Sequence, residues 1–145
     1  MSAVKQALIE LARNLADECT WDDVMYQVYV RQKIEAGARF AMTQALFDLS
    51  YLDRFEEQLG GWPVPLLVGI FYVRSHQLAV RLHNEVPGIV VPEHVQRRLE
   101  SAGSNAGAEG LALARELYAE AREKAAGVYL IPPFKQPEAA LDVFA

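Results

Sequence analysis

The chain has 145 residues, of which 52% are hydrophobic and 23% charged, a composition typical of one soluble globular domain and unlike that of a disordered protein. Its 14 basic and 19 acidic residues give a net charge of −5, and the absence of a dense Lys/Arg stripe argues against a nucleic-acid partner. Cys19 is the only cysteine, which excludes internal disulfides and multi-cysteine metal sites. The charged amino terminus predicts neither a signal peptide nor a membrane span, so we expect a cytoplasmic protein.

Two helices are predicted at the amino terminus. Apolar residues recur at helical spacing from Val4 to Leu15, the stripe of an amphipathic helix that must pack on another element. Thr20 with Asp23 resembles a capping box and starts a second helix, which runs to residue 35 or 36. Gly37 then ends this helix in a left-handed turn and releases the chain into a strand.

Three strand-like segments follow, separated by helical ones. They are Ala38 to Gln44, Val64 to Phe71 and Gly127 to Phe134. Strands alternating with helices predict βαβ units in a parallel sheet, an α/β fold whose ligands bind at the carboxyl ends of the strands. The polar residues expected along that rim are Thr43, Gln44, Arg74, Ser75, Lys135 and Gln136.

Helical periodicity, caps and breakers divide the connecting segments. Alanine-, leucine- and glutamate-rich sequence after residue 108 is the strongest helix signal among them. The predicted helices cover 46–59, 74–84, 92–101, 108–125 and 137–144, with a loop at 103–107.

Four sequence strings carry a family resemblance from about Lys33 to the end. They are KIEAGARFAMTQ, VPLLVGIF followed by VRS, LHNEVPGIVVPEHV, and GVYLIPPF. In this order and spacing they resemble the carboxyl-terminal part of methylenetetrahydrofolate reductase, closest to the form fused to homocysteine S-methyltransferase. The resemblance implies a (β/α)8 TIM-type barrel carrying FAD, which passes a hydride from NADH or NADPH to methylenetetrahydrofolate. It places the chain in one-carbon metabolism and methionine biosynthesis, with the three strands as the sixth, seventh and eighth of the barrel.

The resemblance also implies site residues. Gln44 takes the position of a glutamine that hydrogen-bonds the folate, and the alternative is an ordinary strand-end residue that caps the next helix. His76 stands where the family has an aromatic residue that stacks on substrate or nicotinamide. Ala45 and Tyr72 replace two family prolines.

The resemblance covers only part of a barrel. The family's acidic proton donor on the first strand, and most FAD contacts, on strands three to five, have no counterpart here. A full barrel needs about 250 residues, so we expect a partial barrel and an oxidoreductase fragment that does not turn over alone, with no catalytic residue assigned.

The amino-terminal residues suggest a second function. The run CTWDDVMYQVYVRQKIEAG resembles small helical antitoxin-like proteins, so we divide the chain into a helical segment, 1–36, and a partial barrel, 37–145. The alternative function is therefore a non-catalytic partner-binding protein. A simpler interpretation is that these helices cover the open sheet, whose free edges otherwise call for a homo-oligomer or a complementing chain.

The remaining candidate groups favour structural interpretations. His76 and His83 lie seven residues apart on a predicted helix face and His94 is remote, so a metal site needs a further ligand that the sequence does not offer. Cys19 has no His or acid partner nearby in sequence to make it a nucleophile. The acidic residues after the first strand are interpreted as the solvated face of a helix, and three glycines after residue 102 as loop and helix-entry positions. These groups are His76, His83 and His94; Asp48, Asp53, Glu56 and Glu57; and Gly103, Gly107 and Gly110.

Overall fold

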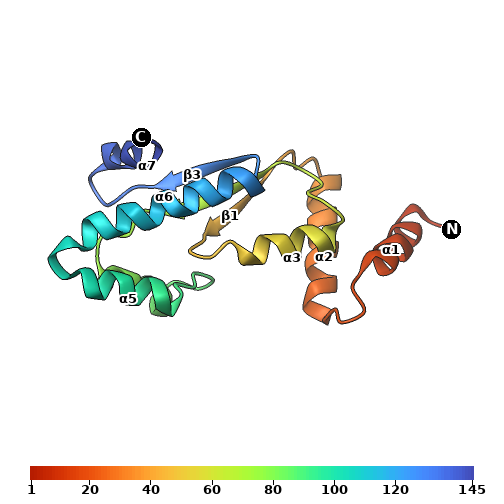
Figure 1. Ribbon diagram of the computed structural model, residues 1–145. Coiled ribbons are helices and arrows are strands. Elements are labelled where there is room, and N and C mark those ends of the chain that lie inside the picture. Colours follow the sequence, from red (N-terminus) through yellow and green to blue (C-terminus); the bar gives the residue numbers. More distant parts are fainter. The chain divides into compact units, whose positions relative to one another are not determined.

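The computed structural model describes residues 1–145 and divides into two compact units (Figure 1). The first unit joins Met1–Ala41 to Tyr51–Pro65, and the second joins Met42–Ser50 to Leu66–Ala145. None of the helices is long and apolar enough to span a membrane. The helices are α1 (Ala3–Asn14), α2 (Trp21–Glu35), α3 (Ser50–Leu59), α4 (His76–Glu85), α5 (Glu93–Ala102), α6 (Ala106–Lys124) and α7 (Leu141–Phe144), with 3-10 turns at Gly103–Asn105 and Pro137–Ala140.

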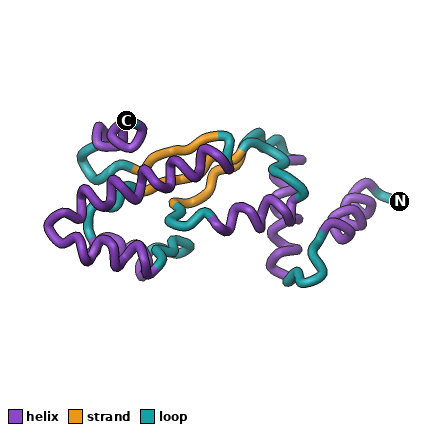
Figure 2. Tube along the Cα trace, in the orientation of Figure 1, coloured by secondary structure: helices purple, strands orange, loops and turns teal.

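A three-stranded parallel sheet forms the second unit's centre, as predicted. Its strands are β1 (Ala41–Ala45), β2 (Leu66–Phe71) and β3 (Gly127–Ile131), in the order β1-β2-β3 (Figure 2). β2 and β3 run parallel in a register that places Gly69 opposite Tyr129. The strands are shorter than predicted, since β1 starts three residues later than Ala38 and β3 ends before its Pro-Pro pair, which cannot continue a hydrogen-bonded ladder.

The core lies between the sheet and helices α4 to α6. Val68 and Ile70 of the central strand are completely buried, and β2 is apolar along its length, as is typical of a central strand in a parallel sheet. The buried residues that form one continuous cluster are Ala45, Phe47, Val73, Ala79, Leu82, Val91, Val95, Leu99, Ala106 and Leu113.

Two glycine predictions in this region were wrong. The predicted loop at 103–107 is a short 3-10 turn that leads directly into α6, whose first residue is Ala106. Gly110 is not an entry residue but lies buried inside α6, where a Cβ would overlap the backbone carbonyl of Val73. Glycine there lets the helix approach the end of β2 more closely than any other residue allows.

The first unit is helical, and its predicted capping box is confirmed. The Thr20 hydroxyl accepts from the Asp23 backbone N–H at 3.2 Å, while Asp23 Oδ2 accepts from the Thr20 N–H at 2.8 Å. Arg31 of α2 donates to the carbonyl of Ala7 in α1 at 3.2 Å. These polar contacts join the helices although α2 buries none of its own residues.

Candidate ligand site at the carboxyl ends of the strands

The end of β1 is attached to β2 through a side chain as well as the backbone. Gly69 N–H donates to Thr43 Oγ1 at 3.0 Å, and Leu46 N–H donates to the Gly69 carbonyl at 2.9 Å. The same Thr43 hydroxyl donates to the carbonyl of Gln44 at 2.7 Å. Thr43 Oγ1 therefore takes the place of a backbone acceptor in the ladder and fixes the peptide that carries Gln44.

The side chain of Gln44 lies against the loop between α4 and α5. Gly88 in that loop has a φ of +83°, and a Cβ on it would lie 2.8 Å from Gln44 Oε1 and 3.2 Å from Nε2. Gln44 is nevertheless exposed to solvent. The amide is thus held on one side by a backbone that tolerates only glycine and remains open to a ligand on the other.

The ends of β2 and β3 meet at the predicted rim. The Arg74 guanidinium donates to Gln136 Oε1 and stands 6.0 Å from the centre of the Tyr72 ring. Lys135, next to this pair, is the one non-glycine residue with a positive φ, at 60°. The structure therefore brings Arg74 and Gln136 together as the parallel arrangement predicts.

The histidines lie in three separate environments. His76 is the first residue of α4 and is half-buried, behind Ser75, whose hydroxyl accepts from the Leu78 N–H at 3.2 Å. His83 Nδ1 accepts from the Val91 backbone N–H at 3.2 Å and so has a structural role. No group of three potential ligands among His, Cys, Asp and Glu lies close enough to hold a metal ion.

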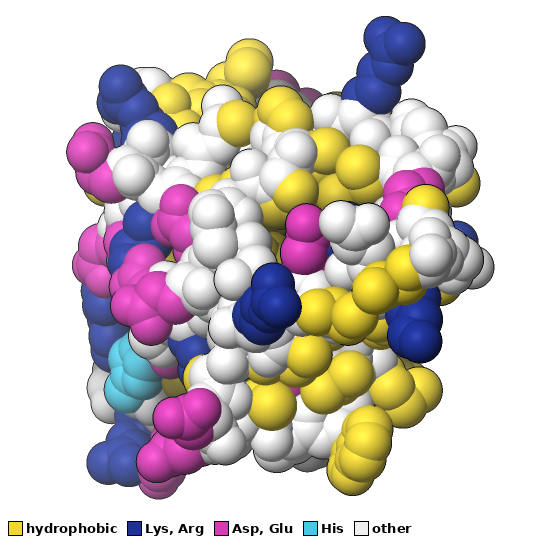
Figure 3. Space-filling view, turned by 90° about the vertical axis from the view of Figure 1, so that its right-hand side faces the viewer, with side chains coloured by type: hydrophobic (Ala, Val, Ile, Leu, Met, Phe, Trp, Pro, Cys, Tyr) yellow, Lys and Arg dark blue, Asp and Glu magenta, His cyan; other side chains and the backbone are white.

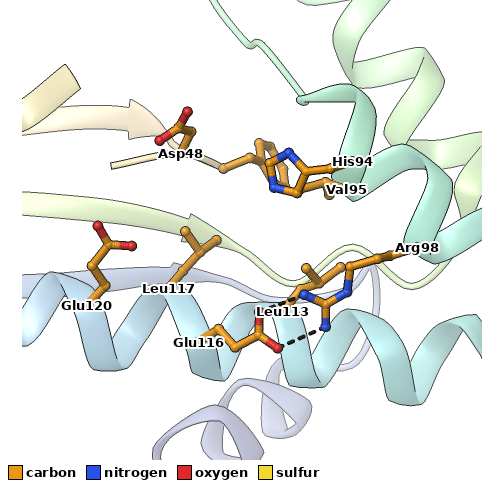
Figure 4. A pocket seen from close by; sticks show the side chains of 9 residues that line it. Asp48, His94, Val95, Arg98, Leu113, Glu116, Leu117 and Glu120 are labelled. Carbon is orange, nitrogen blue, oxygen red and sulfur yellow. Dashed lines mark hydrogen bonds and ion pairs between the residues drawn. The ribbon is translucent and has the colours of Figure 1, made fainter. Parts of the chain in front are cut away.

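An acidic cavity of about 210 Å³ lies elsewhere in the second unit (Figure 4). Asp48 lines this cavity and precedes α3, rather than lying on that helix as predicted. The Asp48 carboxylate accepts a hydrogen bond of 2.9 Å from the Ser50 N–H, and this bond lowers the pKa of Asp48. The Arg98 guanidinium donates hydrogen bonds of 2.7 and 2.8 Å to the Glu116 carboxylate, and they lower the pKa of Glu116. The lining residues are Phe47, Asp48, His94, Val95, Arg98, Leu113, Glu116, Leu117 and Glu120.

The acidic cavity does not fit FAD. The acidic cavity, at about 210 Å³, is smaller than the roughly 300–1,000 Å³ of typical ligand pockets. Its lining has three carboxylates, Asp48, Glu116 and Glu120, and its one guanidinium, Arg98, already bonds Glu109 and Glu116. The cavity therefore repels a diphosphate. No step of flavin chemistry is therefore assigned to this cavity.

Three residues of the site were missed by sequence reasoning. Tyr129 donates its hydroxyl to the Thr43 carbonyl, while Gly69 and Gly88 make room for neighbouring side chains. A glycine inside the otherwise apolar strand VPLLVGIF was the available signal, since such a glycine often marks a close approach of other groups.

Comparison with known proteins supports the family resemblance. The profile of the family described as methylenetetrahydrofolate reductase matches residues 17–128. The match includes α2, which the antitoxin resemblance had separated from the barrel. No curated protein matches the chain significantly.

A solved structure with a similar chain course is an uncharacterized protein from Clostridium thermocellum that binds two copies of 5-methyl-5,6,7,8-tetrahydrofolic acid. It is 14% identical with a TM-score of 0.49, and the alignment covers 81% of this chain and 45% of that one. The chain thus spans less than half of that protein's length. Because the family profile matches well over half of the residues, the chain belongs to the methylenetetrahydrofolate reductase family.

Proposed function

We propose that this chain binds a reduced folate at the rim of its sheet, with Gln44 as the hydrogen-bonding ligand. The observation that carries the proposal is the Gln44 amide, exposed at the carboxyl end of β1 and backed by Gly88. A glutamine amide offers two donors and one acceptor with two lone pairs, which suits a pterin ring that presents both kinds of group. His76 follows the end of β2 and is proposed as a second contact, stacking on the ligand.

Reductase activity needs more than these residues. In the family, FAD transfers the hydride from NADH or NADPH. We infer that this chain contributes binding and orientation, and that turnover in one-carbon metabolism and methionine biosynthesis, in the cytoplasm, depends on further strands from a complementing chain or a second copy. The small acidic cavity supports this division, as do the two sheet edges left by the strand order β1-β2-β3.

The test is isothermal titration with 5-methyltetrahydrofolate. Substitution Gln44→Ala is expected to weaken binding by about fivefold to tenfold, the loss of roughly one net hydrogen bond. Gln77→Ala is the matched control, because Gln77 is an exposed glutamine in α4 of the same unit. Equal affinities for the two variants would refute the role of Gln44. In a separate experiment, protein that is mixed with FAD and retains flavin absorbance through a sizing column would refute the inference that further strands are needed to bind the cofactor.

A second candidate function is association between copies through α2. Trp21, Met25 and Tyr29 lie four residues apart and are 82%, 68% and 55% exposed, so they form one apolar stripe along the helix. Figure 3, which views the molecule from the right-hand side of Figure 1, shows hydrophobic side chains on that face among charged ones.

Light scattering on a sizing column tests this candidate. The double substitution of Trp21 and Met25 by Asp is expected to convert an oligomer to a monomer. Val90→Asp, at a residue 57% exposed in the other unit, should leave the mass unchanged. An unsubstituted protein with the mass of a monomer would refute self-association through α2.

A further inference from the structure

Tyr129 links one edge strand of the sheet to the other. In the register of β2 and β3, Tyr129 lies directly opposite Gly69. Its hydroxyl does not stop at β2 but donates to the backbone carbonyl of Thr43 on β1. A side chain on β3 therefore crosses the central strand and hydrogen-bonds the residue immediately before Gln44.

Gly69 makes this crossing possible. A Cβ on Gly69 would lie 2.5 Å from Tyr129 Oη and 2.6 Å from Cζ, both far below van der Waals contact. Every other residue at position 69 would therefore push the ring off the sheet. Since Gly69 is a buried residue within a strand, where glycine is otherwise unfavourable, the crossing gives a physical reason for its presence.

The Thr43 peptide is held from two directions. Its carbonyl accepts from Tyr129, and its side-chain hydroxyl accepts from Gly69 N–H while donating to the Gln44 carbonyl. Together these bonds fix both peptide groups around the Cα of Gln44. The direction in which the Gln44 side chain leaves the strand, toward Gly88, is consequently set by backbone contacts and not by the side chain of Gln44 itself.

We propose that Tyr129 is a positioning residue for Gln44, acting through the Thr43 carbonyl and without touching the ligand. This inference rests on the proposed folate site and adds to it a residue that determines how the amide is presented. Preorganising a ligand-binding side chain raises affinity because less conformational freedom is lost on binding. The tyrosine hydroxyl should therefore matter only while the Gln44 amide is present.

A double-mutant cycle tests this dependence. Tyr129→Phe removes only the hydroxyl and is expected to weaken 5-methyltetrahydrofolate binding by about threefold to tenfold. In the Gln44→Ala background the same substitution should change affinity less than about twofold, because coupled residues are non-additive. Equal weakening in both backgrounds would overturn the proposal, since Tyr129 would then act independently of Gln44.

The matched control is Tyr72→Phe. The Tyr72 hydroxyl also donates to a backbone carbonyl in the same unit, but to that of Gly107 in α6, at 3.0 Å, and not to that of Thr43 in β1. Its loss should leave affinity within about twofold of the unsubstituted protein. An equal effect of the two tyrosine substitutions would indicate general loosening of the fold and would overturn the positioning role.

A measurement without ligand separates this proposal from the proposed function. The side-chain amide resonances of Gln44 in the NMR spectrum should shift in Tyr129→Phe and stay in place in Tyr72→Phe. Unchanged Gln44 resonances in Tyr129→Phe would overturn the positioning role. If these resonances shift but the protein does not bind 5-methyltetrahydrofolate, the folate site is refuted while the positioning of Gln44 by Tyr129 stands.

Discussion

Replacing Gly69 by alanine should destabilise the protein by roughly 2–3 kcal/mol. The new methyl carbon would lie 2.5 Å from Tyr129 Oη and 2.9 Å from the Gln44 carbonyl oxygen. Overpacking of this kind costs about 1–3 kcal/mol, and the displaced tyrosine loses a hydrogen bond worth about 0.5–1.5 kcal/mol. The smaller conformational entropy of alanine in the unfolded chain offsets about 0.4–1 kcal/mol of this sum.

Urea unfolding followed by circular dichroism measures this free energy. Gly127→Ala is the matched control, because Gly127 also lies in a strand and its Cβ would meet only Leu67 Cδ2, at 3.0 Å. The far end of a leucine side chain can move aside, so this substitution should cost less than about 1 kcal/mol. In a Tyr129→Ala background the cost of Gly69→Ala should fall by at least about half. Similar costs for Gly69→Ala and Gly127→Ala, or an undiminished cost without Tyr129, would refute the reasoning.

Two further predictions concern α6. Gly110→Ala should lower the free energy of unfolding by more than about 2 kcal/mol, because the new Cβ overlaps the Val73 carbonyl. Gly107→Ala should raise the free energy of unfolding by about 0.5–1 kcal/mol, because its Cβ lies 3.5 Å from the nearest side-chain atom and alanine is the better helix former. Urea unfolding of both variants checks these opposite signs. Hydrogen bonds from Arg98 hold the pKa of Glu116 below its ordinary value. The stabilisation is therefore complete above about pH 4.3 and is lost as the pH falls through the lowered pKa. An NMR titration should show the Glu116 pKa rising toward its ordinary value in Arg98→Gln, and an unchanged pKa would contradict this explanation.

The element order was predictable because the strongest local signals agree with the packing. The capping box at Thr20 and the apolar run before Phe71 both lie where the structure has a helix start and a strand. The region between Gly103 and Gly110 was not predictable, because glycine there serves a contact between α6 and the end of β2. By local propensity such glycines are helix breakers, whereas in the folded protein they let α6 pack closely against the end of β2. The proposed domain boundary after residue 36 stays a prediction.

The candidate site divides in a similar way. The ends of parallel strands meet at one rim, so the pairing of Arg74 with Gln136 follows from the strand pattern. The crossing of Tyr129 over β2 to Thr43 depends on the register of the strands. The apolar pattern does not determine this register, because a shift by two residues leaves the same side chains on the same face of the sheet. The roles of Gln44 and His76 come from the family resemblance and remain proposals.

The geometry around Gln44 is built within one of the two compact units. The groups that surround Gln44 come from β1, β2, β3 and the loop after α4, all within Met42–Ser50 and Leu66–Ala145. That unit contains its own buried core around the central strand, so the geometry of the amide does not depend on a closed barrel. The acidic cavity in the same unit, at about 210 Å³, is by contrast too small for a flavin. A barrel segment added to this unit should therefore leave unchanged the way in which Tyr129 and Gly69 position Gln44.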